Sequence, residues 1–468
     1  MTELRKAIAE IQPLTIGEMI RLAKDHNVRV IDVVLEEAIF QTGLSREEIL
    51  TRVMDEYAHN LKALDIGLED GESVLLGTAA ADLNKMERPL VFADSFLDNA
   101  LLYTLAAQVG NHCIGLRPCA GTGDSCPYAG FVKAMQTAGY DELFIAEIAA
   151  LILKIGSIYR VAKITTGCNL EGFGAGAACI AAATVALNGG TPEQMEQAMV
   201  LAISPTIAVP CTPRVLVPAL CTTHVGGAIL IGMYSGKLCT LVDIGVNVPV
   251  DVMLAMASEV HVESARHVVP TVVEYMEPFF RRKDDVESLV EQSVKDAEAL
   301  ETEQTLNKAK EIAKELSKGT SSILDTFGDA VVGGSSQGVG SPTNTARIAH
   351  GLVKGTIQKI TIELYPELFA RRTINIPGIL MGAVFGSDTS DYEMYNKAVN
   401  LTKEKGIEVE ILEVQEESVQ RVTIYSDEMT VMVDSLNRGG GRVHLRNAEP
   451  SLEAATQVAK DLGIVLAK

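Results

Sequence analysis

The feature that most constrains the fold is the long stretch 145–275, in which Ala, Ile, Val and Leu dominate and Gly and Pro interrupt the run. Such a stretch is typical of closely packed, buried helices separated by turns. The chain of 468 residues is 47% hydrophobic but only 5% aromatic and has no Trp, so aliphatic side chains must build its core. We therefore expect a large, mostly α-helical N-terminal domain.

Helix start signals support this expectation. Residues 1–110 repeat apolar side chains at spacings of three and four, as an amphipathic helix does. Ser45 and Glu48 form a predicted capping box, and Thr191 with Gln194 forms a second one. Three segments rich in Gly, Pro and Cys are expected to be turns: 117–130, 166–177 and 204–219.

The composition changes twice along the chain. Residues 282–318 are charged and rich in Glu, Lys and Ala, which predicts an exposed helical connector. Later segments alternate apolar and polar residues, as strands do, with helical segments 344–354 and 391–406 between them. The fold class expected is multidomain, a large helical domain followed by a smaller α/β domain. The predicted domains are 1–281, 282–320 and 321–468, and the predicted strands lie in 356–368, 407–414, 420–426 and 429–436.

Charge and hydropathy exclude some classes of protein. The net charge of −21 argues against nucleic-acid binding, which needs clustered Lys and Arg. Residues 215–236 are uncharged over nearly a membrane-spanning length, but they contain Pro218 and His224 and lack an aromatic belt, so we expect a buried core helix. The N-terminus carries charges where a signal peptide has an apolar segment. We expect a cytoplasmic protein without a membrane partner.

All eight cysteines lie between residues 113 and 239. A long chain with clustered cysteines is unlike a secreted disulfide scaffold, so we expect free thiols, some of them ligands of a metal or an iron–sulfur cluster. The alternative is that these cysteines are small buried residues of an Ala-rich core. No C-x-x-C pair or P-loop lysine occurs, which disfavours structural zinc and nucleotide hydrolysis. Widely spaced cysteines on loops fit an iron–sulfur cluster best.

Several motifs resemble one known family over nearly the whole chain. They are PCAGTGDSCPYAG (118–130), GCNLEGFGAGAAC (167–179), AVPCTPR (208–214), SSILDTFGDAVVGGSS (321–336), TARIAHGLVKG (345–355) and GGGRVHL (439–445). Together they resemble the iron–sulfur-dependent L-serine dehydratase family, with its α part followed by its β part in one chain. The resemblance implies a helical α-like domain, an α/β β-like domain and a homodimer.

The resemblance also implies a [4Fe–4S] cluster held by cysteine thiolates. Cys168 and Cys211 match two of the family's ligands, whereas Ser204 stands where the family has a cysteine. We expect the third thiolate from Cys126, which lies in the loop that the family places near the cluster, with Cys119 and Cys221 as alternatives. The family's cysteine at the chain end is absent here, since the chain ends in Lys468.

The residues around the substrate follow from the same resemblance. The family's β-part histidine is missing, because Gln337 follows Ser335 and Ser336. Candidates for the catalytic base are therefore Glu171, His350 and His224, with His112 as a further possibility, although a histidine on an apolar helix face is more often a core residue. The substrate-binding residues expected are Gly121, Thr122, Gly123, Ser335, Ser336 and Arg347.

The expected function is a lyase of amino acid degradation. It would eliminate a β-substituent from a small amino or hydroxy acid, with L-serine converted to pyruvate and ammonia as the first choice. One cluster iron would act as a Lewis acid on the hydroxyl group. Two alternatives stay open: a lyase of the same family acting on another β-hydroxy or β-thiol acid such as L-cysteine, and a cluster-free ligand-binding or regulatory protein.

Overall fold

The computed structural model describes residues 3–467 except 118–124, 163–172, 210–216, 218, 319–329 and 335, and the side chains of 161, 162, 336 and 337 are also outside the description. The chain forms two compact units, Met1–Glu311 and Ile312–Lys468. It is 67% helical with a five-stranded mixed sheet in the second unit, so the predicted fold class is confirmed. The division at Glu311 falls within the predicted connector, whose outer bounds stay predictions.

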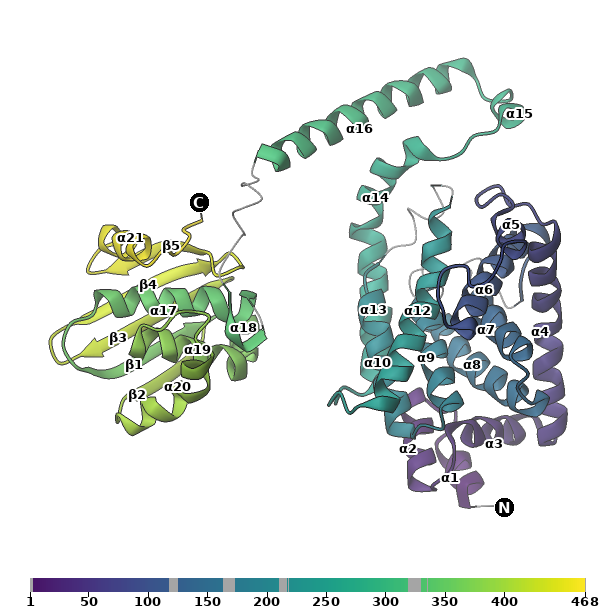
Figure 1. Cartoon of the computed structure of the whole chain (residues 1–468), viewed down its shortest axis with the longest axis horizontal. Coiled ribbons are helices and arrows are strands. Elements are labelled where there is room, and N and C mark those ends of the chain that lie inside the picture. The colour runs from purple at the N-terminus through teal and green to yellow at the C-terminus, as the bar shows by residue number, and fades with distance from the viewer. Residues whose placement is uncertain are drawn as a thin grey trace. The chain divides into compact units, whose positions relative to one another are not determined.

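The first unit is built from helices around one aliphatic core (Figure 1). In its centre α12 packs on α9, α6 and α7, α7 also packs on α6 and α9, and α4 and α8 pack around these helices. The helices described are α1 (Glu3–Ile11), α2 (Ile16–Asp25), α3 (Val30–Thr42), α4 (Arg46–Glu69), α5 (Ala79–Asn84), α6 (Ser95–Ile114), α7 (Ser125–Thr137), α8 (Glu142–Ala162), α9 (Gly176–Leu187), α10 (Pro192–Ile203), α12 (Leu220–Leu241), α13 (Val250–His267), α14 (Val269–Met276), α15 (Asp284–Glu287) and α16 (Gln292–Lys318).

Both predicted capping boxes are present. At the start of α4 the Ser45 hydroxyl accepts from the Glu48 N–H, and the Glu48 side chain accepts from the Ser45 N–H. Thr191 and Gln194 make the same reciprocal pair at the start of α10. These bonds satisfy N–H groups that have no partner inside the helix.

The turn predicted over 117–130 is wrong in its second half, because Ser125 begins α7. Pro127 is tolerated there, since the first helical turn does not need its N–H group. Gly130 permits close packing, because a Cβ atom at this position would lie 2.6 Å from the Thr104 nitrogen of α6. Similarly, α9 begins at Gly176, inside the second predicted turn, after a π-helical turn at 173–175.

The apolar stretch 215–236 forms α12 from Leu220 onward, as predicted, and α12 packs on α9. Its exposed side includes Leu230 and Tyr234, so the helix is buried on one side only. Among the residues that the structure describes, none of the helices has the length and apolar character needed to cross a membrane. Within the predicted connector the chain forms α16, where Thr305 is the buried residue.

Helices α4 and α6 approach each other closely enough for backbone contact. A Cβ atom on Gly67 would overlap the Ala106 carbonyl oxygen, and one on Gly110 would overlap the Ala63 carbonyl oxygen. Only glycine fits at these two positions without moving a helix. The contact fixes the position of α6 along the axis of α4. Because Gly130 lets α7 pack closely on the other side of α6, α6 lies between α4 and α7.

We predict that Gly110→Ala lowers the free energy of unfolding by about 3 kcal/mol or more, because the new methyl group meets rigid backbone. Chemical denaturation followed by circular dichroism measures this change. Gly226→Ala is a matched control, since Gly226 is also helical but its Cβ would only touch Leu101 Cδ2 at 3.4 Å. An unchanged stability in Gly110→Ala would contradict the close approach.

A cluster of charges joins α3, α4 and α8. The Glu147 carboxylate, which is 6% exposed, accepts from Arg29 at 2.8 Å and also pairs with Arg46. Asp32 pairs with the same two arginines. Burial alone would raise the pKa of Glu147, but the hydrogen bonds from the arginines outweigh it and hold the pKa below its usual value.

We predict that Glu147→Gln destabilises the protein by roughly 2 kcal/mol at neutral pH, since two arginines lose a shared charged partner while solvent screens them in part. Because the pKa is lowered in the folded state, this stabilisation is present above the unfolded-state value of 4.5 and is lost as the pH falls through the lower folded value. Denaturation at pH 7 and at pH 3 should therefore show a difference between variant and wild type that shrinks in acid. A difference independent of pH would contradict this account.

The second unit is a five-stranded sheet with helices packed on one face (Figure 1). The strand order is β2-β1-β3-β4-β5, with β1 and β2 parallel and the other pairs antiparallel. Helix α17 packs on β3 and β4, and α19 packs on α17. The elements are α17 (Ser341–Leu352), β1 (Ile357–Leu364), α18 (Pro366–Ala370), α19 (Arg372–Phe385), α20 (Tyr392–Glu404), β2 (Glu408–Glu413), β3 (Val419–Ser426), β4 (Thr430–Asn437), β5 (Val443–Glu449) and α21 (Leu452–Asp461).

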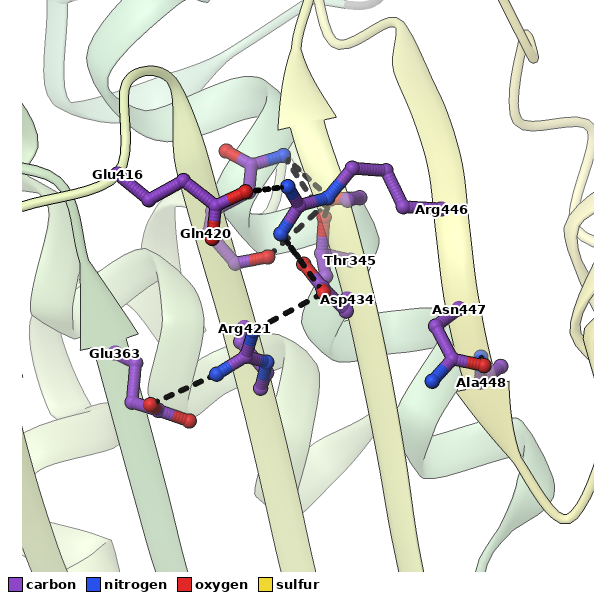
Figure 2. A network of polar contacts seen from close by, with 10 residues as sticks. Thr345, Glu363, Glu416, Gln420, Arg421, Asp434, Arg446, Asn447 and Ala448 are labelled. Carbon is purple, nitrogen blue, oxygen red and sulfur yellow. Dashed lines mark hydrogen bonds and ion pairs between the residues drawn. The ribbon is translucent and has the colours of Figure 1, made fainter. Parts of the chain in front are cut away.

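The two faces of this sheet carry different chemistry, as Figure 2 shows at β3. Gln420 faces α17, where its amide donates to the Thr345 hydroxyl at 2.9 Å. Its neighbour Arg421 lies on the other face and pairs with Asp434 at 3.1 Å, and Arg446 pairs with the same carboxylate at 2.8 Å. The alternation is that of a strand. One face therefore belongs to the apolar core, with a buried polar group around Gln420, and the other carries a ladder of ion pairs.

Candidate functional site

Most of the predicted site residues lie outside the described part of the chain. The structure does not test the predicted residues on three cysteine-bearing segments, 118–124, 163–172 and 210–216, or on the segment before α17. For Ser336 only the backbone is described, and it lies in a π-helical turn from Ser336 to Gly340. These assignments stay predictions. The residues outside the description are Cys119, Gly121, Thr122, Gly123, Cys168, Glu171, Cys211 and Ser335.

The described residues that follow these cysteine-bearing segments lie close together. A Cβ atom on Gly176, the first residue of α9, would lie 3.1 Å from Pro127 Cγ of α7 and 3.0 Å from Ala228 Cβ of α12. The ring of Phe173, directly after 163–172, packs against His224 of α12 at 5.2 Å between centroids. The first turns of α7 and α9 therefore meet beside the second and third turns of α12.

Cys126, the described residue among the three predicted cluster ligands, is a fully buried thiol in the first turn of α7. Its Sγ atom lies 2.8 Å from Gln108 Oε1 of α6. Gln108 Nε2 lies 3.2 Å from His112 Nε2 one helical turn later, and His112 Nδ1 is hydrogen-bonded to Ser73 Oγ. A hydrogen-bonded chain of four side chains thus runs from Ser73 to the thiol.

The Gln108 amide can serve this chain in two orientations. In one, the Cys126 thiol donates to Oε1 and Nε2 donates to His112. In the other, the Gln108 amide is turned over, so that its Nε2–H donates to a Cys126 thiolate and its Oε1 accepts from the Nε2–H of His112. The Ser73 hydroxyl then donates to Nδ1 of His112. Burial lowers the pKa of His112, which favours the neutral ring that both arrangements require. The second arrangement would stabilise Cys126 as a ligand anion.

The turn that carries Ser73 also contacts the start of α12. The Ser73 hydroxyl accepts from the N–H groups of Leu75 and Leu76 at 3.1 Å each. The Leu75 carbonyl in turn accepts from the N–H of Ala219 at 2.8 Å. Ala219 has a left-handed backbone (φ 71°), a conformation that costs a non-glycine residue energy. One short turn therefore links the start of α12 to the hydrogen-bonded chain behind Cys126.

Of the three candidate bases, the structure describes two. His224 is 3% exposed in the second turn of α12 and packs on Phe173, two residues after Glu171. His350 lies in the second unit, where its Nδ1–H donates to the Ala383 carbonyl at 2.9 Å and its ring packs on Gly386. His350 therefore binds the end of α19, whereas His224 lies beside the end of a cysteine-bearing segment.

Arg347, predicted to bind a substrate carboxylate, is 7% exposed and engaged within the second unit. Its guanidinium donates to Asn344 at 2.8 Å and pairs with Asp388 at 3.3 Å. These contacts join α17 to the segment before α20, and the substrate-binding role of Arg347 stays a prediction.

The chemistry of the described residues fits a thiolate ligand at Cys126 and does not by itself complete a cluster site. No group of three His, Cys, Asp or Glu side chains that could hold a metal ion occurs within the described ranges. Cys179 donates to the Ile152 carbonyl at 3.4 Å and Cys221 is 5% exposed in the first turn of α12. Any cluster must therefore draw on Cys168, Cys211 or Cys119.

Ser73 and Gln108 were not among the predicted site residues. The spacing of Gln108 and His112, four residues apart in a helix, was a signal that the two share a face. Nothing in the sequence places Ser73 beside them, because the contact depends on how the turn between α4 and α5 packs on α6.

Among curated proteins, the chain is similar to the "Probable L-serine dehydratase, alpha chain" of Bacillus subtilis (strain 168). The two are 24% identical over 214 residues, which is 42% of this chain and 69% of that protein. No family model matches the chain. At this identity the similarity supports a distant relationship to that protein's family.

We predict that Gln108→Met lowers the free energy of unfolding by about 2 kcal/mol, because it leaves the buried Cys126 thiol without its partner and removes a hydrogen bond of His112. Adding Cys126→Ala should cost less in this background than in the wild type, with a coupling of about 1 kcal/mol in the double-mutant cycle. Gln136→Met, at an exposed position of α7, should be neutral. Additive effects of the two changes would show that Gln108 and Cys126 do not interact.

Proposed function

We propose that this protein is a serine dehydratase-like lyase that converts L-serine to pyruvate and ammonia. The distant similarity to a Bacillus L-serine dehydratase alpha chain suggests the lyase class. The observation that carries the proposal to this chain is the meeting of the first turns of α7 and α9 with the N-terminal half of α12, since each of these helices follows a cysteine-bearing segment. The proposal includes a [4Fe–4S] cluster as cofactor.

In this proposal Cys168, Cys211 and Cys126 hold the cluster. When bound, it would supply a Lewis acid for the departing β-hydroxyl group, since hydroxide is a poor leaving group. The Gln108–His112–Ser73 chain would hold Cys126 in the orientation and charge state of a ligand. The N-terminal ends of three helices favour the negative charge of thiolates and of a substrate carboxylate through the helix dipole.

The substrate's α-proton must pass to a base. His224 is the described candidate whose surroundings suit this role, because it is buried beside Phe173 and close in sequence to the Cys168 segment. Glu171 and His350 remain the other candidates. After loss of the hydroxyl, the aminoacrylate product tautomerises and hydrolyses to pyruvate and ammonia without further catalysis.

A homodimer is part of the same proposal. The exposed apolar side chains Tyr234 and Leu241 on α12 and Val252 and Met256 on α13 are residues that a second copy could cover.

Two alternative functions differ from this proposal, one in its substrate and the other in the absence of a cluster. One is a lyase for another β-hydroxy or β-thiol acid such as L-cysteine, and the other is a cluster-free binding protein.

The test is iron and acid-labile sulfide per chain after anaerobic purification, together with pyruvate formation from L-serine and from L-cysteine. We predict a cluster-bearing protein whose Cys168→Ser and Cys211→Ser variants lose iron and at least about 10²-fold in turnover. Cys239→Ser is the matched control, because burial raises the pKa of this thiol and disfavours a thiolate ligand.

Each outcome separates the alternatives. Iron with pyruvate from L-cysteine only would assign the second substrate class. A chain that stays free of iron after anaerobic reconstitution would overturn the cluster mechanism. Equal iron loss in Cys239→Ser would show that the variants act through the fold and not through ligation.

A further inference from the structure

A cavity of about 140 Å³ lies among the helices of the first unit. Helices α6, α7, α9 and α12 and the turn between α7 and α8 each contribute to its lining, which combines aromatic rings, aliphatic side chains and a polar rim. An apolar cavity of about 150 Å³ in a protein interior can hold one benzene ring. The volume therefore matches a single aromatic ring.

The cavity lies toward the other end of these helices from the candidate site. Phe96 is the second residue of α6, whereas Gln108 and His112 lie in its last two turns. Leu187 ends α9, whose first residue, Gly176, meets α7 and α12 at the candidate site. Because α9 has 12 residues, its two ends are about 17 Å apart. The cavity is therefore separate from the groups proposed to hold the cluster.

The aromatic walls of the cavity are held by contacts between rings. Phe96 packs edge-on against Phe131, with 5.3 Å between the ring centroids, and edge-on against Tyr140 at 6.2 Å. Tyr140 also contacts the ring of Phe144 at 6.2 Å. Phe131 is fully buried, whereas Tyr140 is 39% exposed and lies at the opening. In a chain that is only 5% aromatic, this cluster offers a further ring the edge-to-face or offset contacts that aromatic pairs prefer.

The rim of the cavity carries a positive charge. The Lys237 ammonium group of α12 lies 3.2 Å from Asp94 Oδ2, and both side chains are about half exposed. An ammonium group has three donors, so Lys237 can bind an anion beside this carboxylate. Asp94 is the N-cap of α6, and the hydrogen bond from the Leu97 N–H holds the pKa of Asp94 below its usual value. Asp94 therefore stays charged and competes with an anionic ligand for Lys237.

The other polar groups of the lining are hydrogen-bonded within α9. The Thr184 hydroxyl donates to the backbone carbonyl one turn earlier at 2.7 Å, and the Asn188 amide donates to the Thr184 carbonyl at 2.7 Å. Met233, which is 5% exposed, adds an apolar wall from α12. Among the described lining residues, Lys237 is thus the group suited to bind the charge of a ligand, and the rest suit a ring.

We propose that this cavity binds a small aromatic acid, with its ring among Phe96, Phe131 and Tyr140 and its carboxylate at Lys237. A ring without a charge would leave Lys237 bound to Asp94 alone, and a carboxylate without a ring would leave the aromatic walls without a partner. The site belongs to the first unit and does not depend on the lyase activity proposed above.

The test is isothermal titration calorimetry on the full-length chain with benzoate, benzamide and acetate as probes. Benzamide has the ring without the charge, and acetate has the carboxylate without the ring. We expect benzoate to bind at one site per chain with a dissociation constant below about 1 mM, and the other two probes to bind at least about fivefold more weakly.

Variants separate the two parts of the site. Lys237→Met should weaken benzoate binding about fivefold and leave benzamide binding unchanged, because the lost charge contact is partly exposed. Asp94→Asn should tighten benzoate binding, since asparagine still caps α6 but no longer competes for the lysine. Tyr140→Ala should weaken the binding of both ring probes about tenfold, whereas Tyr140→Phe keeps the ring and should bind as the wild type does.

The opposite signs at Lys237 and Asp94 make the result independent of folding defects, since a misfolded variant does not gain affinity. Lys133→Met is the matched control, because it breaks a similar lysine–aspartate pair, at 2.9 Å between α7 and α4, and should leave benzoate binding unchanged. Repeating the titration on Cys168→Ser protein separates the site from the lyase, because benzoate should still bind.

Four results would overturn the proposal. Absence of benzoate binding would remove the site, and acetate binding as tight as that of benzoate would show that the ring is not recognised. Equal affinities for benzoate and benzamide would show that the charge is not recognised. Equal weakening in Lys133→Met and Lys237→Met would show that the effect does not arise in this cavity.

Discussion

The arrangement of the candidate site depends on the backbone contact that holds α6 between α4 and α7. Gly67 and Gly110 bring α6 against α4, and Gly130 brings α7 against the other side of α6. Gln108 and His112 are carried on α6 and Cys126 on α7, so a shift of α6 by the width of a methyl group would change the distances between these side chains. The hydrogen-bonded chain is short because the helices are close, and the helices are close because three positions lack a Cβ atom.

Because these helices pack so closely, the polar side chains between them must form hydrogen bonds with one another. The Cys126 thiol and the Gln108 amide are buried away from water, so each needs a hydrogen-bond partner within the protein. The turn at Ser73 ends the chain with a hydroxyl that accepts two backbone N–H groups and faces an imidazole. The same principle holds in the second unit, where the Gln420 amide donates to hydroxyls of α17 and β4.

Local signals made part of this fold predictable. The capping boxes could be read from the sequence because each joins residues three apart, and four strands alternate clearly enough to be recognised. Strand β5 was missed because its burial pattern is irregular beside a shift of register between Asp434 and Ser435. At the candidate site, Cys126 was predicted from a motif, whereas its partners Gln108 and Ser73 are brought to it by packing between segments distant in sequence. Spacing cannot reveal such contacts.

The helix α16 has a consequence for how a protein of this kind can be encoded. Thr305 is its buried residue, and each unit has an apolar core of its own on either side of it. A break in the chain within this helix would expose little apolar surface, so both halves could fold as separate products. One gene carrying both units, or two genes carrying one unit each, would then yield the same pair of folded parts. Selection could move between a fused and a divided form without rebuilding either core.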